Sequence, residues 1–370
     1  MKYFLLFIAV FNAAFLFGQQ DLNEAEILID NNRCSEAIEL LKKLQSDYGT
    51  LYGNIDTSHY SKCLVHLAKA YVCINNWDKA LPLFLQAKGV YESQDALMNT
   101  YFSEILAYLG SYYENTGNIE NAELMYKQTF LVREKVFGTQ HPKYVEIVLS
   151  LGNFYRATGN FEYSRNYLEN AMAIELEQHG EFSAQYSIVL QALGSLYLAM
   201  GNNEKASYLL NKALPIIENT YGRESDQYMR ALNDLGVVNF NLSQFENAEQ
   251  VFSEIIDLKI KTGNANNVFI ATYYQNLASV YIMMGNYSKA EPMLAKAMDI
   301  SAAQYGSKSL AYAYILYTLG ALYRDQREYD KSEEVLLNVL KIVKKISGTK
   351  SIFYAQVLNA LGTVAYDKGR

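Results

Sequence analysis

A period of 42 residues runs through almost the whole of this 370-residue chain. A leucine followed by glycine or alanine recurs at this spacing, at Leu67, Leu109, Leu151, Leu193, Leu235, Leu277, Leu319 and Leu361. Twelve residues after the glycine or alanine of the first seven copies, from Ala80 to Ser332, stands another alanine or serine. A fixed period of this length is typical of arrays in which one small unit stacks on the next. The sequence therefore predicts one repeat array rather than two or three unrelated domains.

Within one repeat the apolar residues have helical spacing. Val148, Leu151 and Tyr155 fall on one stripe, and Gly159, which follows them, is the residue type that closes a helix in the left-handed conformation. A second amphipathic run covers residues 162–178 and ends at another periodic glycine, Gly180. The chain has only four prolines to interrupt such runs. Each unit is therefore predicted to be helix, tight turn, helix and short loop, which makes the fold all-α and built of antiparallel helix pairs.

Small and aromatic residues both have a packing reason in this scheme. Gly110 on a first helix and Ala122 on a second helix would let the two helices approach closely, where larger side chains would overpack. The chain has 32 tyrosines and one tryptophan, and many tyrosines recur at fixed repeat positions, such as Tyr144 and Tyr186. We expect these rings to pack in the core between helices, with their hydroxyl groups reaching water or a carbonyl. A set of aromatic rings that binds a ligand is the alternative.

The repeat resembles the tetratricopeptide repeat family. Leu109-Gly110 with Tyr113, the mid-repeat Ala122 and the later aromatic Tyr126 are the residues that carry the resemblance. The 42-residue length, with Gly-x-x-His-Pro at 138–142, is similar to the kinesin-light-chain type, here in a bacterial exported form. The family's terminal proline is missing, its first-helix tryptophan is replaced, and His-Pro occurs once only. The resemblance covers residues 22–370 and implies a right-handed superhelical solenoid of about eight repeats plus a partial ninth, with units starting near 22, 58, 98, 141, 183, 225, 267, 309 and 351.

The first 18 residues are predicted to be a secretory signal peptide. Lys2 precedes an apolar run from Tyr3 to Phe17, and Gly18 offers a small residue for cleavage. As a helix this run would be about 22 Å long, too short for a hydrocarbon core of about 30 Å. We therefore expect export to the periplasm or the extracellular space of a bacterium, with no membrane span after cleavage. A buried N-terminal helix is the alternative.

The charge balance bears on the choice of partner. Asp and Glu outnumber Lys and Arg by 39 to 32, which gives a formal net charge of −7. Because nucleic-acid binding requires a basic surface, no nucleic-acid partner is expected.

Reactive groups are few. No catalytic motif stands out, and no metal or cofactor is expected. His59, Cys63 and His66 share one predicted helix face, but without a further ligand nearby they are interpreted as ordinary surface or core residues. A bridge between Cys34 and Cys73 is the alternative to our preferred prediction, in which all three cysteines are small buried hydrophobic residues. The oligomeric state is left open.

A ligand would lie along the inner wall formed by the first helices. The residues that the resemblance places on this wall are Asn153, Arg156, Gln191, Ser195, Arg230, Asn233, Gln275, Asn276, Ser279, Arg324 and Asn359. Amide side chains both donate and accept, so they suit the backbone of an extended protein segment. An ordinary solvated helix face is the alternative. The basic clamp of chaperone-binding relatives is suggested only by Lys62 and Lys69, so that activity is not expected.

These features predict a non-enzymatic scaffold that binds a peptide or protein segment in its concave groove. The chain stops at Gly369-Arg370, where the second helix of the ninth unit should begin, and solenoids normally end in a polar cap. The alternative is therefore an N-terminal sensing array of a longer effector, with a caspase-like protease or a signalling module beyond Arg370.

Overall fold

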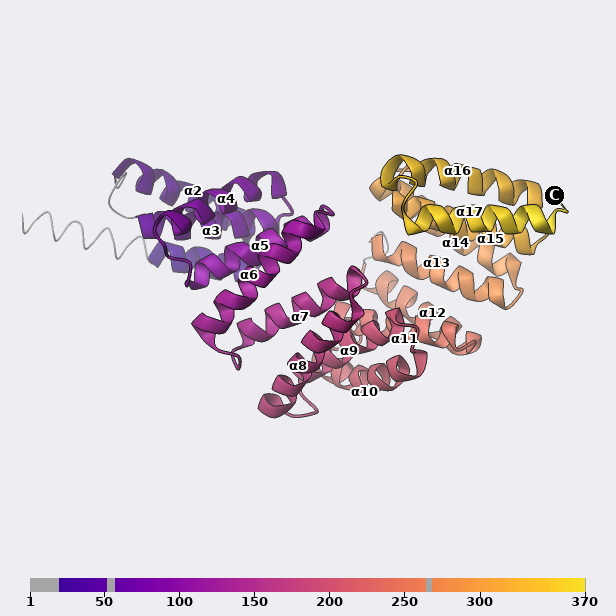
Figure 1. Ribbon diagram of the computed structural model, residues 1–370, viewed down its shortest axis with the longest axis horizontal. Helices are drawn as coiled ribbons and strands as arrows, with labels where there is room; N and C mark the ends of the chain where they lie inside the picture. The colour runs from indigo at the N-terminus through magenta and orange to yellow at the C-terminus, as the bar shows by residue number, and fades with distance from the viewer. Residues whose placement is uncertain (1–19, 52–56, 264–267, 370) are drawn as a thin grey trace, which may run out of the picture. The chain divides into compact units, whose positions relative to one another are not determined.

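The computed structural model describes residues 20–51, 57–263 and 268–369. These residues are helical with short connections and contain no strand, so the predicted all-α fold of helix pairs is confirmed (Figure 1). The chain divides into two compact units, Met1–Ile174 and Glu175–Arg370. The predicted signal peptide at 1–18 lies outside the described residues.

The first unit is a run of helices in which each helix from α2 to α8 packs against the next along the chain. It begins with a helical segment at 20–30. The helices that follow are α2 (Cys34–Leu51), α3 (Thr57–Cys73), α4 (Trp77–Ser93), α5 (Thr100–Asn115), α6 (Ile119–Phe137), α7 (Pro142–Ala157) and α8 (Phe161–His179), whose residues after 174 belong to the second unit.

The second unit continues the same alternation of first and second helices. Its helices are α9 (Ala184–Ala199), α10 (Asn203–Tyr221), α11 (Asp226–Asn241), α12 (Phe245–Lys261), α13 (Val268–Met283), α14 (Tyr287–Tyr305), α15 (Leu310–Asp325), α16 (Tyr329–Ser347) and α17 (Ile352–Asp367).

The turn inside each pair requires a left-handed residue. Gly159 between α7 and α8 has φ +79°, and Arg327 between α15 and α16 adopts φ +65° at the equivalent position. This conformation costs a residue with a Cβ about 1–2 kcal/mol, so glycine is the usual occupant. Asparagine often follows the turn, and the Asn202 side chain caps α10 by accepting the backbone N–H of Lys205.

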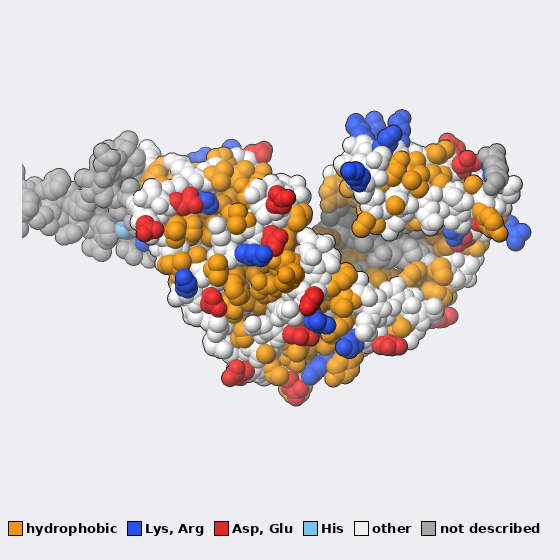
Figure 2. Space-filling model, viewed as in Figure 1, with side chains coloured by type: hydrophobic (Ala, Val, Ile, Leu, Met, Phe, Trp, Pro, Cys, Tyr) orange, Lys and Arg blue, Asp and Glu red, His pale blue; other side chains and the backbone are white. Residues whose placement is uncertain are grey.

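Close helix approach explains the periodic small residues. Gly152 of α7 faces Leu168 of α8, and the hydroxyl of Ser164 on α8 donates a hydrogen bond of 2.7 Å to the Gly152 carbonyl. The recurring tyrosines follow the packing prediction in part: Tyr144 and Tyr186 are buried, whereas Tyr312 and Tyr354 at the same repeat position are half-buried. Large hydrophobic side chains are nevertheless exposed in both units, as the orange areas in Figure 2 show on one face. None of the helices in the described part of the chain has both the length and the apolar character that a membrane span requires.

A disulfide joins the first two helix pairs. Cys34 at the start of α2 is bonded to Cys73 at the end of α3, with their Cα atoms 6.2 Å apart. The preferred prediction of three unbridged cysteines is therefore wrong for these two. The reason is tertiary: α2 packs against α3, which brings residues 39 positions apart together. Cys63 is a buried free thiol, whose S–H donates to the carbonyl of Leu41 at 3.4 Å.

Candidate functional site

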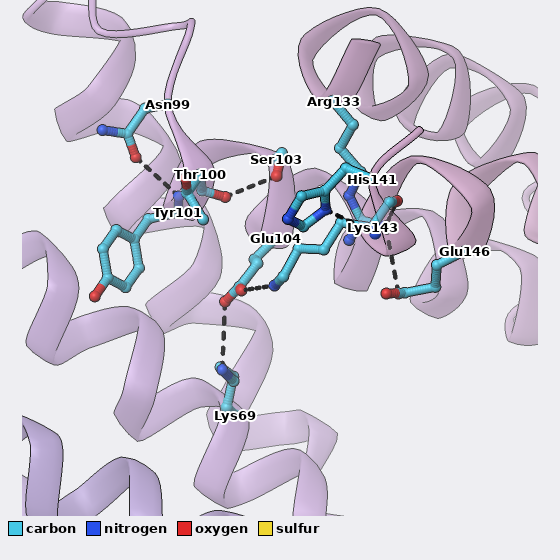
Figure 3. Close-up of polar contacts among 10 residues, drawn as sticks. All are labelled: Lys69, Asn99, Thr100, Tyr101, Ser103, Glu104, Arg133, His141, Lys143 and Glu146. Carbon is cyan, nitrogen blue, oxygen red and sulfur yellow. Dashed lines mark hydrogen bonds and ion pairs between the residues drawn. The ribbon is translucent and has the colours of Figure 1, made fainter. Parts of the chain in front are cut away.

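Charged side chains link three consecutive first helices of the first unit. Glu104 on α5 lies between Lys69 on α3 and Lys143 on α7 (Figure 3). The Nζ of Lys69 is 3.3 Å from Oε2 of Glu104, and the Nζ of Lys143 donates to Oε1. Asn99 caps α5 and His141 caps α7, which fixes where these helices begin and therefore where Glu104 and Lys143 fall.

The charge of Glu104 is held by its two lysines. Its side chain is only 12% exposed, and burial alone would raise its pKa. The positive charges of Lys69 and Lys143 and their hydrogen bonds outweigh burial and hold the pKa of Glu104 below its usual value. Glu104 therefore remains ionised at neutral pH and ties the three helices together.

A cavity of about 380 Å³ opens beside this charged group. It is bounded by α3, α5, α6 and α7, and its charged lining residues are Lys69, Glu104, Arg133, Lys143 and Glu146. Tyr108 also lines it. Burial, with the nearby carboxylates of Glu104 and Glu146, raises the pKa of Tyr108 to about 12, so its hydroxyl group stays protonated, and able to donate, well above neutral pH.

Polar side chains also connect first helices in the second unit. Ser195 on α9 donates to Asp234 on α11. The Nδ2 of Asn276 on α13 donates to Oδ1 of Asn233 on α11 at 3.2 Å. The Nε2 of Gln275 donates across to α15, at 3.2 Å to the Tyr314 carbonyl and 2.9 Å to the Thr318 hydroxyl. We call these contacts, with those of Glu104, the first-helix polar contacts.

A second cavity, of about 540 Å³, lies among α13, α14 and α15. Three exposed aromatic residues line it: Phe269, Tyr305 and Tyr314. Its polar lining residues are Thr272, Gln275, Asn276 and Ser301, and none of the described residues around it is charged. The cavity is therefore neutral and partly aromatic.

The residues predicted for the inner wall fall into three groups. Ser195, Asn233, Gln275 and Asn276 make first-helix polar contacts, and Gln275 and Asn276 also line the second cavity. The second group makes hydrogen bonds within its own helix: Arg230 donates to the Asp226 carbonyl, Ser279 to the Gln275 carbonyl and Arg324 to the Asp325 side chain. The third group is Asn153, Arg156 and Gln191, which are half-buried, and Asn359, which is exposed.

The sequence did not single out Glu104, Arg133 or Lys143. For Arg133 a signal existed, because the equivalent positions in other repeats hold apolar residues such as Ile217 and Val343. Charged residues are rarely fully buried, so a cation at a position where other repeats place an aliphatic side chain marks a local departure from plain packing.

The group of His59, Cys63 and His66 lies inside α3, as the sequence predicted, and the side chains are buried. Burial raises the pKa of the Cys63 thiol to about 12 and lowers that of His66 to about 4. Among the described residues, no cluster of His, Cys, Asp or Glu could hold a metal ion.

Comparison with known proteins connects these helix pairs to one family. Models described as tetratricopeptide repeat match residues 64–94, 104–143, 144–219, 227–303, 268–336 and 311–370. No curated protein sequence matches the chain.

Several solved structures are similar to this chain at low sequence identity. A Rap protein complexed with Competence and Sporulation Factor is 15% identical, covers 95% of this chain and 99% of its own, and has a TM-score of 0.60. A tetratricopeptide repeat protein from Parabacteroides merdae is 16% identical, covers 82% of this chain and 98% of its own, and has a TM-score of 0.54. A putative kinesin light chain from Podosopora anserina is 19% identical, covers 57% of this chain and 99% of its own, and has a TM-score of 0.47. With repeat models matching more than half of its residues, the chain belongs to the tetratricopeptide repeat family.

Proposed function

We propose that this protein is a non-enzymatic interaction scaffold that binds an extended protein segment along its first helices. The observation that carries the proposal is the second cavity. It combines exposed aromatic rings with the amides of Gln275 and Asn276, and this mixture of apolar surface and a few polar groups is typical of binding sites. The Rap protein of similar fold was crystallised with Competence and Sporulation Factor, which supports a binding role.

The amides retain acceptor capacity for a ligand. Gln275 uses its Nε2 group toward α15, and Asn276 uses its Nδ2 group toward Asn233. Each of these two amides also has an oxygen that can accept a backbone N–H from an extended segment. The hydroxyl group of Thr272 on the same wall adds a donor.

We also propose that the protein is exported. The predicted signal peptide motivates this assignment, and the disulfide between Cys34 and Cys73 supports it, because disulfides persist in the periplasm and outside the cell and are rare in the cytosol.

Photo-crosslinking of this protein to proteins of the envelope fraction tests the binding proposal. In one variant a benzophenone amino acid replaces Thr272 in the cavity. In the matched control the same amino acid replaces Tyr208 on α10, whose side chain is 69% exposed. A partner adduct is expected at position 272 and not at 208. Asn233→Ala combined with Gln275→Ala should reduce capture while helicity is unchanged. An adduct at 208 alone, or full capture by the double variant, would place binding on the outer surface instead.

A further inference from the structure

One position on the second helices is buried in the seven described repeats from α4 to α16 but changes its chemistry. We call it the floor position; it holds Tyr91, Arg133, Glu175, Ile217, Lys259, Ser301 and Val343, each at most 5% exposed. Ile217 and Val343 show that an apolar side chain satisfies packing there. Polar and charged residues at the same position therefore need partners of their own.

Both cavities have a floor-position residue in their lining. Arg133 lines the charged cavity of the first unit, and Ser301 lines the neutral cavity of the second, four repeats further along the sequence. The Nε of Arg133 and the Oγ of Ser301 are buried and have no hydrogen-bond partner among the residues described. By contrast, Lys259 at the same position is paired with Asp226 at 2.6 Å.

The guanidinium of Arg133 is incompletely neutralised. Its Nη1 donates to the Lys143 carbonyl at 2.7 Å and lies 3.4 Å from Oε1 of Glu146. Glu146 is 62% exposed, whereas Arg133 is 3% exposed, so this carboxylate is largely solvated. The other nearby carboxylate, Glu104, is already bound by two lysines.

The cavity as a whole lacks one negative charge. Its lining holds three cationic side chains, Lys69, Arg133 and Lys143, and two carboxylates, Glu104 and Glu146. A buried cation is costly unless it is paired. Arginine also offers a planar fork of N–H donors that matches a carboxylate.

We propose that this cavity is a carboxylate-binding site, in which Arg133 receives an acidic side chain of the bound segment. The incoming carboxylate takes the unpaired Nε–H of Arg133 and displaces Glu146 toward solvent. The hydroxyl group of Tyr108 supplies a further donor from the cavity wall. This inference rests on the proposed function, because the carboxylate is assigned to a segment lying on the first helices.

Two blocked tripeptides test the site directly. One is acetyl-Gly-Glu-Gly-amide, and the other carries Gln in place of Glu, so the two differ only in the charged group. Sodium acetate is the third probe. Binding is followed through the ¹⁵Nε–¹H signal of Arg133, which is assigned by its absence from the Arg133→Gln variant. We expect the glutamyl peptide to shift this signal and to bind about tenfold or more tightly than the glutaminyl peptide.

Three variants separate the site from general effects on folding. Arg133→Gln should weaken the glutamyl peptide about tenfold or more, with its fold checked by circular dichroism. Glu146→Gln removes an exposed internal competitor and should tighten binding about two- to fivefold, a gain that misfolding cannot imitate. Lys259→Gln changes the same floor position in another repeat and should leave binding unchanged.

Equal binding of the two peptides to the wild type, or no gain with Glu146→Gln, would overturn the site. Acetate binding as tightly as the glutamyl peptide would overturn its assignment to a protein segment. If the site failed while the Thr272 crosslink to a partner persisted, the scaffold function would stand without it.

Discussion

Gly152 on α7 and Leu168 on α8 lie so close that a Cβ added to the glycine would be 2.5 Å from Cδ2 of the leucine. Leu168 is fully buried, so it has little room to move away. The same close approach recurs at Gly320, whose added Cβ would meet Leu336 at 2.8 Å. Glycine at this repeat position therefore sets the separation of the two helices in a pair.

We expect Gly152→Ala to destabilise the first unit by about 1–3 kcal/mol through overpacking. Gly362→Ala is the matched control, because Gly362 holds the same repeat position in α17 and an added Cβ there meets no described atom within 4 Å. That substitution should be neutral or stabilising by up to about 1 kcal/mol. Urea unfolding measures both, and similar losses in the two variants would contradict the close-approach explanation.

Reduction of the Cys34–Cys73 disulfide should destabilise the first unit by about 4 kcal/mol. The value follows from the 39-residue separation of the two cysteines and the entropy of loop closure in the unfolded chain. Thermal unfolding with and without a reductant measures the change, and a Cys34→Ser/Cys73→Ser variant should match the reduced protein. Alkylation of the denatured, unreduced protein should modify Cys63 alone; three modified cysteines would refute the bridge.

Acid should destabilise the first unit through His66. Burial, with the charge of Lys69, lowers the pKa of His66 to about 4, against about 6.5 in an unfolded chain. Between these values the unfolded state binds more protons than the folded state, so stability falls as the pH drops from about 6.5 to 4, by up to about 3 kcal/mol. His66→Phe keeps a ring beside Tyr101 and should flatten this dependence. Identical pH profiles of unfolding for the two proteins would exclude the effect.

Asp226→Asn should cost about 1–3 kcal/mol, because it removes the charged partner of buried Lys259. A second substitution, Lys259→Met, should restore most of the loss, since the floor position accepts apolar side chains such as Ile217. Chemical denaturation of the single and double variants gives the coupling energy. Additive losses would show that the ion pair is not what Asp226 contributes.

The repeat itself was predictable from the sequence because it depends on local spacing. The periodic leucines, the small residues and the turn at Gly159 each determine a helix, a close approach or a reversal within one unit, and the structure has all three. Contacts between neighbouring repeats were harder to predict from the sequence. The bond between Cys34 and Cys73 depends on how α2 packs against α3, which helical spacing alone does not determine.

Only some of the residues around the candidate site were accessible from the sequence. The resemblance led to Gln275 and Asn276 on a first helix, and both line a cavity; that they bind a ligand stays a prediction. The resemblance could not show that they also bond to Thr318 and Asn233, because side-chain direction across two helices is a tertiary property. The cavity around Arg133 depends on four helices at once, so it became visible only in three dimensions.

The hydrogen bonds of the Gln275 amide determine whether a ligand in the second cavity would affect the contact between α13 and α15. Its two N–H groups already fasten α13 to α15 through Tyr314 and Thr318. A ligand that accepted these two N–H groups would have to break the hydrogen bonds between α13 and α15, so its binding would loosen the contact between two neighbouring repeats. A ligand that used only the amide oxygen would leave those hydrogen bonds intact, and its binding would not change that contact.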